Sequence, residues 1–115
     1  MSAPLCHFEF MTDNPEKCRI FYGKVFGWKF NVNSMPGYTM IDTGGPPAGG
    51  LMQRPPQAPA PALNTYFMVE DIDATLRKVQ EAGGRVLVPK TPIPNVGSFA
   101  FFADPEGICV GIFVS

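Results

Sequence analysis

The chain has 115 residues and a mass of 12.5 kDa, the size of one domain, and it is 45% hydrophobic and 17% charged, as globular proteins are. Its net charge is −1 and it has no run of Lys or Arg, which excludes the basic surface that nucleic-acid binding needs. It also has no apolar stretch near the roughly 18 residues that span a bilayer, and its first residues lack the layout of a signal peptide. We therefore expect one cytoplasmic domain, residues 1–115, with no nucleic-acid or membrane partner.

The cysteines are three in number and widely spaced, at Cys6, Cys18 and Cys109. An odd number without a metal-binding spacing argues against a disulfide framework and against a zinc knuckle. Free thiols are the expectation.

Two halves of the chain share one pattern. Residues 7–30 align with residues 64–87 at a constant offset (64 − 7 = 57), and the offset matches Phe10 with Phe67 and Gly27 with Gly84. Each half reads as a short apolar strand, an acidic or amide cap, an amphipathic helix, a glycine stop and further strands. The repeat predicts two β-α-β-β-β modules.

In the first half, Asn14 is a good helix cap, with Pro15 at the first helical position and Gly27 as the stop. The expected apolar face of this helix is Cys18, Tyr22, Val25 and Phe26. Three strands are then predicted, at residues 28–32, 38–43 and 49–54.

In the second half, Asp71 is the expected cap, and Gly83 and Gly84 end the helix. Its predicted stripe is Thr75, Val79 and Ala82, with Ile72 and Leu76 beside it. The predicted strands are residues 85–88, 98–103 and 108–114, with a turn from Pro89 to Gly97 and Phe99, Phe101 and Phe102 in the core. Residues 55–62 form a Pro-Ala connector between module one, about 5–54, and module two, about 63–115.

The chain resembles the vicinal oxygen chelate superfamily, which includes glyoxalase I, bleomycin resistance proteins and extradiol dioxygenases. The segments that carry the resemblance run along nearly the whole chain: His7-Phe8-Glu9, Asn14-Pro15-Glu16-Lys17, Phe26-Gly27-Trp28, Gly49-Gly50-Leu51-Met52, Val69-Glu70-Asp71 and Asp104-Pro105-Glu106-Gly107. The resemblance implies an α+β fold in which two β-α-β-β-β modules form a curved, incompletely closed mixed sheet around a cleft. It also implies a homodimer.

The resemblance further implies a divalent metal, Ni, Zn, Mn or Fe, held at the first and last strand of each module. His7 keeps a ligand at the first of these places, because a neutral imidazole suits such metals. Asn64 offers only an amide oxygen, the carboxylate place of the last strand is Gly111, and module one offers Gly50 or Met52. A catalytic site for these metals has three protein ligands, so we expect no tightly bound metal.

Strand alternation selects the residues that would line the cleft. If His7 points inward, so do residues of the same parity, and the expected ligand-binding residues are His7, Glu9, Met11, Tyr38, Met40, Met52, Asn64, Tyr66, Met68, Cys109 and Gly111. This wall is rich in Met and aromatic groups, with a few polar side chains, and it suits a flat or apolar organic molecule.

The leading hypothesis is a protein that binds a small apolar or aromatic molecule at a degenerate metal site. The alternative is a metal-dependent lyase, isomerase or dioxygenase with an atypical ligand set that includes His7. If the protein is an enzyme, we expect a glyoxalase-like lyase or a dioxygenase. A subunit that binds a partner protein and leaves its cleft unused is a third interpretation. The catalytic residues and the ligand stay open.

Overall fold

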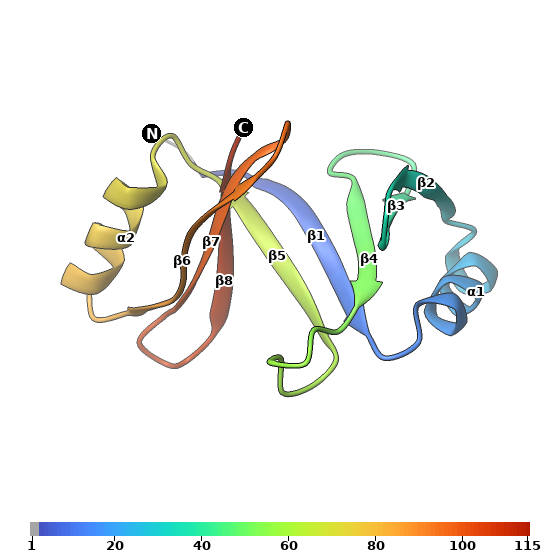
Figure 1. Ribbon diagram of the computed structural model, residues 1–115, viewed down its shortest axis with the longest axis horizontal. Coiled ribbons are helices and arrows are strands. Elements are labelled where there is room, and N and C mark those ends of the chain that lie inside the picture. Colours follow the sequence, from blue (N-terminus) through green and yellow to red (C-terminus); the bar gives the residue numbers. More distant parts are fainter. Residues whose placement is uncertain (1–2) are drawn as a thin grey trace. The chain divides into compact units, whose positions relative to one another are not determined.

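The computed structural model describes residues 3–115 and contains two α-helices among β-strands (Figure 1). In chain order the elements are β1 (Leu5–Thr12), α1 (Pro15–Phe26), β2 (Lys29–Met35), β3 (Tyr38–Asp42), β4 (Gly49–Gln53), β5 (Ala62–Met68), α2 (Ile72–Glu81), β6 (Arg85–Ile93), β7 (Gly97–Ala103) and β8 (Cys109–Val114). The expected α+β fold with two β-α-β-β-β modules is confirmed.

The chain divides into two compact units, residues 7–64 and residues 65–115 together with the chain up to Cys6. The first unit holds nearly all of module one, and its strands run in the order β2-β3-β4-β1. Within it β1 pairs with β4 in parallel, and β4 pairs with β3 and β3 with β2 in antiparallel fashion. The second unit repeats this plan, with the order β5-β8-β7-β6 and a parallel pair between β5 and β8.

Helix α1 begins and ends where the sequence predicts. The side chain of Asn14 accepts a hydrogen bond from the backbone N–H of Lys17, and Gly27 ends the helix in the left-handed conformation. Tyr22 packs against Phe10 and Trp28, with ring centroids 4.9 and 5.4 Å apart. An aromatic cluster on the sheet therefore anchors the helix.

The predicted apolar face of α1 is only partly correct. Val25 and Phe26 keep 53% and 59% of their surface exposed, and no residue of the helix is fully buried. Phe26 still lies 4.9 Å from Trp28, ring to ring. Two aromatic rings of the helix, Tyr22 and Phe26, thus pack on Phe10 and Trp28 while staying partly exposed.

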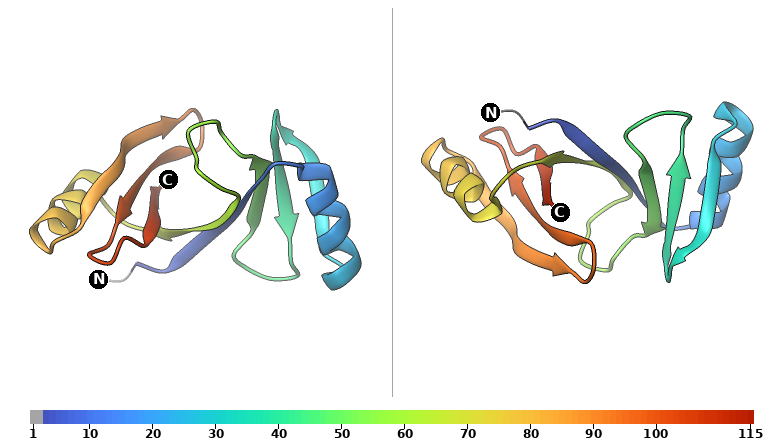
Figure 2. Two further views of the ribbon diagram at one scale, coloured as in Figure 1. Left: turned by 90° about the horizontal axis from the view of Figure 1, so that it is seen from below. Right: turned by 90° about the horizontal axis from the view of Figure 1, so that it is seen from above.

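Helix α2 packs more deeply than α1 does. Its N-cap Asp71 accepts from the backbone N–H of Ala74, and the residues it buries are Ile72 and Leu76. These two, rather than the predicted stripe of Thr75, Val79 and Ala82, form the core of module two with Ala100 and Ile112. Figure 2 shows each helix alongside the strands of its own module.

Strand β6 corrects the predicted turn from Pro89 to Gly97. The strand continues through Pro89 and Pro92 to Ile93, with register shifts against β7 on the way. It is the edge strand of its module, and an edge position tolerates proline because one side of the strand needs no ladder partner. Pro89 and Pro92 are therefore compatible with a strand at this edge of the sheet.

Within residues 3–115, neither helix has the length and apolar character needed to cross a membrane.

Candidate functional site

One face of the module-one sheet gathers the polar residues that the sequence singles out. Helix α1 covers the other face, where the ring of Phe8 fills the space beside Gly49 and lies 6.1 Å from Trp28. Strand register determines which residues share the face opposite the helix. Glu9 and Met40 both pair with Gly50, and Met11 and Tyr38 both pair with Met52. The structure thus places the module-one candidates together: His7, Glu9, Met11, Tyr38, Met40 and Met52.

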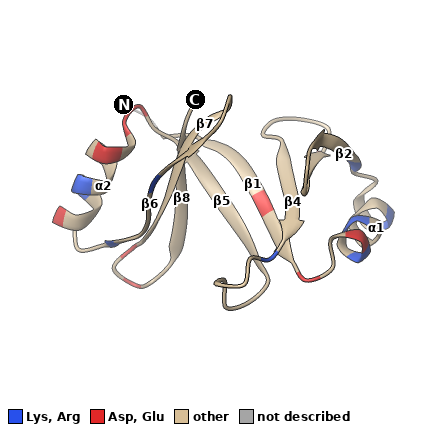
Figure 3. Ribbon diagram, in the orientation of Figure 1, with Lys and Arg blue, Asp and Glu red and all other residues tan. Residues whose placement is uncertain are grey.

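A hydrogen-bonded cluster of three side chains lies at the centre of this face. The Tyr38 hydroxyl is 2.7 Å from His7 Nε2 and donates to Glu9 Oε1 at 2.9 Å. Glu9 is only 7% exposed, and it is the buried charged residue in a strand that carries no other acid (Figure 3). We call these three residues the His7–Tyr38–Glu9 cluster.

Gly50 makes room for this cluster. A Cβ atom at residue 50 would coincide with the hydroxyl oxygen and ring carbons of Tyr38. The missing side chain is therefore a requirement of the cluster and not a local weakness of the strand.

His7 is half-buried, and its environment favours the neutral ring. Burial lowers the pKa of His7 below its ordinary value of 6.5, while the Glu9 charge and a backbone hydrogen bond at Ala48 act in the opposite direction. A neutral imidazole can both donate and accept a hydrogen bond, and His7 uses this capacity in its bond to the Tyr38 hydroxyl and in the one at the Ala48 backbone.

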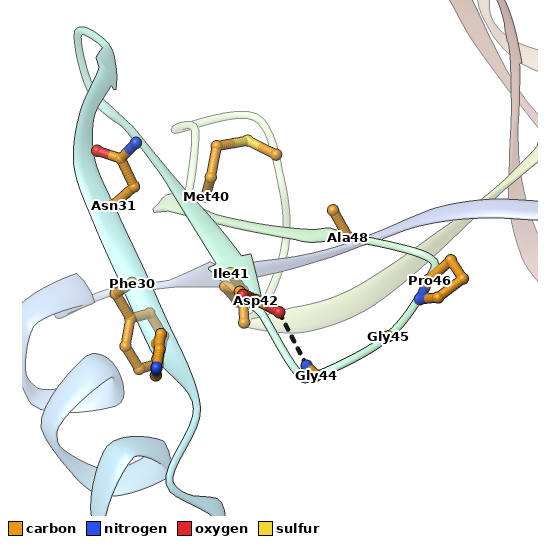
Figure 4. A pocket seen from close by; sticks show the side chains of 10 residues that line it. Phe30, Asn31, Met40, Ile41, Asp42, Gly44, Gly45, Pro46 and Ala48 are labelled. Carbon is orange, nitrogen blue, oxygen red and sulfur yellow. Dashed lines mark hydrogen bonds between the residues drawn. The ribbon is translucent and has the colours of Figure 1, made fainter.

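An open groove of about 650 Å³ lies on the same module (Figure 4). Met40 and Ala48 line it, and Ala48 is the residue whose backbone bonds His7, so the groove adjoins the cluster. The groove residues that the sequence reasoning missed are Lys29, Phe30, Asn31, Ile41, Asp42, Gly44, Gly45, Pro46 and Ala48. No sequence pattern marked these residues, because it is the β2–β3 register that sets Asn31 opposite Met40.

Module two carries a second group of candidates, on its own sheet. Tyr66 pairs with Gly111 on β8, and its ring lies 5.3 Å from that of Phe101. Phe101 lies a further 5.8 Å from Phe99, so these two rings share the face of Tyr66. Of the three phenylalanines predicted to lie in the core, Phe102 packs against the α2 core, whereas Phe99 and Phe101 are half-buried on the opposite face, with Phe101 against the buried ring of Tyr66.

The remaining candidates have less definite surroundings. Met68 pairs with Phe113, and Asn64 is half-buried on β5. Cys109 is an exposed free thiol at the start of β8, and partial burial raises its pKa, which disfavours the thiolate.

The residues present do not fit a catalytic metal. Within either unit, among residues 3–115, no three His, Cys, Asp or Glu side chains come together closely enough to hold an ion. Module one offers His7 and Glu9, and both already bond the Tyr38 hydroxyl. The last-strand positions Gly50 and Gly111 have no side chain to contribute.

The fold defines a class of protein built from two β-α-β-β-β modules, each with its helix on one face of its own sheet. The profile of the Glyoxalase/Bleomycin resistance protein/Dioxygenase superfamily matches residues 5–112. The chain belongs to that superfamily.

Relatives and structures agree with this assignment. The chain is 34% identical over 112 residues to a Mycobacterium bovis protein provisionally named glyoxylase CFP32, covering 91% of this chain and 43% of that protein. It is 30% identical over 110 residues to the anthracycline biosynthesis protein DnrV of Streptomyces peucetius, covering 81% and 40%. The chain therefore spans less than half the length of these curated relatives.

A solved structure shows the same fold at low identity. The protein BH1468 of Bacillus halodurans C-125 superposes with a TM-score of 0.75 at 15% identity, covering 100% of this chain and 96% of that one.

Proposed function

We propose that this protein binds a small apolar or aromatic organic molecule on the module-one face that carries the His7–Tyr38–Glu9 cluster, and that it does so without a tightly bound metal. The observation that carries the proposal is the cluster itself, set among Met11, Met40 and Met52. Methionines supply an adaptable, polarisable surface, and a few fixed polar groups orient a ligand upon it.

The polar part of the face determines how a ligand would be oriented. His7 and Tyr38 are held by hydrogen bonds before any ligand arrives, so binding loses little side-chain entropy. The groove beside them, lined by Met40, Ala48 and Pro46, offers apolar contact for the body of the molecule. A planar ring with one or two hydrogen-bonding substituents satisfies both parts.

Fluorescence titration with 1-anilinonaphthalene-8-sulfonate, a dye with aromatic rings and a polar group, tests this proposal. We expect saturable binding at one site that is unchanged by a chelator. His7→Ala should weaken it by about 1–2 kcal/mol, roughly 5- to 30-fold, because the Tyr38 hydroxyl then loses a hydrogen bond that holds it in place. Tyr22→Phe, on the opposite face of the sheet, is the matched control and should bind as the unaltered chain does.

Two results would contradict the proposal. Dye binding that ignores His7→Ala would place the site elsewhere. Binding that appears only after Ni, Zn, Mn or Fe is added would favour the metal-dependent lyase, isomerase or dioxygenase.

Homodimerisation stays a prediction, and light scattering of the purified chain measures it.

A further inference from the structure

Tyr38 has a role beyond contact with a ligand. We infer that its hydroxyl group takes the place of a metal ion at His7, and that Tyr38 and Gly50 together keep this face metal-free. The inference rests on the proposed function and explains why the site works without a metal. Three observations carry it, all within residues 7–64.

The first observation is that the Nε2 nitrogen of His7 already has a hydrogen-bond partner. Nε2 lies 2.7 Å from the Tyr38 oxygen. If Tyr38 donates its single proton to Glu9, Nε2 must carry a proton of its own to bond the oxygen; if Tyr38 donates to His7, Nε2 accepts with its lone pair. In either tautomer no lone pair on Nε2 is left for a metal.

The second observation is that the same hydroxyl group holds the other donor. Tyr38 bonds Glu9 Oε1 at 2.9 Å, and Glu9 is 7% exposed. The two side chains on this face with metal-binding chemistry are thus bridged by one phenol oxygen. A metal ion that used both would have to displace it.

The third observation is that a side chain at residue 50 and the Tyr38 ring cannot both fit on this face. Gly50 pairs with Glu9 on one side and with Met40 on the other, so a side chain at residue 50 would project beside the cluster. The Tyr38 hydroxyl and ring occupy the space that a Cβ atom at residue 50 would need. A third protein ligand at residue 50 is therefore possible only when Tyr38 is removed.

A cycle of variants tests the inference, with Ni²⁺ alone as the probe and calorimetric titration as the readout. The variants are Tyr38→Ala, Gly50→Glu and the two combined, each also made with His7→Ala, and circular dichroism verifies that each folds. Tyr22→Phe removes a phenol hydroxyl from the helix-covered face and is the matched control.

We expect no stoichiometric Ni²⁺ in the unaltered chain, in Gly50→Glu or in Tyr22→Phe. Tyr38→Ala should bind Ni²⁺ at least ten times more tightly than the unaltered chain, because His7 and Glu9 are released. The combined variant should bind one ion most tightly of all, since a carboxylate then joins them as a third ligand. Both gains should vanish with His7→Ala. If the combined variant does not fold, Tyr38→Phe, which keeps the ring and removes the hydroxyl, should still show a His7-dependent gain.

The outcomes separate this inference from the proposed function. Ni²⁺ binding by the combined variant or by Tyr38→Phe that is no tighter than in the unaltered chain would overturn the role of Tyr38 and leave dye binding intact. A stoichiometric, His7-dependent Ni²⁺ ion in the unaltered chain would overturn the inference and the metal-free function together.

Discussion

Removing the Tyr38 hydroxyl should destabilise the protein measurably. Tyr38→Phe keeps the ring but deletes the bonds of 2.7 Å to His7 Nε2 and 2.9 Å to Glu9 Oε1. Taking away one partner of a buried polar group costs about 1–3 kcal/mol, and more when the group is charged. With Glu9 only 7% exposed, we expect a loss of about 2–3 kcal/mol in the free energy of unfolding.

Urea unfolding at pH 7, followed by circular dichroism, measures this loss. Tyr22→Phe removes a hydroxyl from a half-buried ring but keeps its packing on Phe10 and Trp28, so it should change stability by less than about 0.5 kcal/mol. Adding Glu9→Gln to each protein completes a double-mutant cycle, in which a coupling energy near 1 kcal/mol is expected between Tyr38 and Glu9. A Tyr38→Phe variant as stable as Tyr22→Phe would refute the reasoning, because the cluster would then contribute nothing to the fold.

Three further predictions concern the helices and His7. Asn14→Ala should cost about 1 kcal/mol in urea unfolding, since the backbone N–H of Lys17 loses its acceptor, while Leu76→Ala, 7% exposed in the α2 core, should cost about 2–5 kcal/mol and the most of any change here. His7, the single histidine, should titrate below pH 6.5 in ¹H-¹⁵N NMR, and Glu9→Gln should lower its pKa further. Because the folded pKa lies below the unfolded one, the unfolded chain binds more protons near that pH, so the His7 contribution to stability is present above pH 6.5 and is lost as the pH falls. A midpoint above 6.5 would contradict the burial of the ring.

Sequence reasoning recovered the repeat and the helix starts because they depend on local chemistry. Asn14 and Asp71 cap their helices through hydrogen bonds to residues three positions on, which a sequence displays directly. Strand parity likewise predicted that His7 and Glu9 share a face, since alternation is a property of each strand, and Tyr38 was expected to join them from a neighbouring strand. The sequence did not reveal that the Tyr38 hydroxyl bonds both His7 and Glu9, because that contact depends on the β3–β4 register.

The errors arose where neighbours decide the outcome. Val25 and Phe26 have the spacing of a buried face, yet the packing of α1 on its sheet leaves more than half of each side chain exposed. Pro89 and Pro92 resemble turn residues, but an edge strand accommodates them. Phe99 and Phe101 alternate with Ala100 and Phe102, and only tertiary packing shows which pair meets α2.

The central claim is that a small molecule binds on the uncovered face of module one. Methyl NMR of protein labelled with ¹³C at methionine and isoleucine methyls, titrated with 1-anilinonaphthalene-8-sulfonate, measures this residue by residue. The account predicts shifts for Met11, Met40 and Met52, with Ile72, buried at 1% exposure in the core of module two, unchanged. Shifts that spare these three methionines would contradict it.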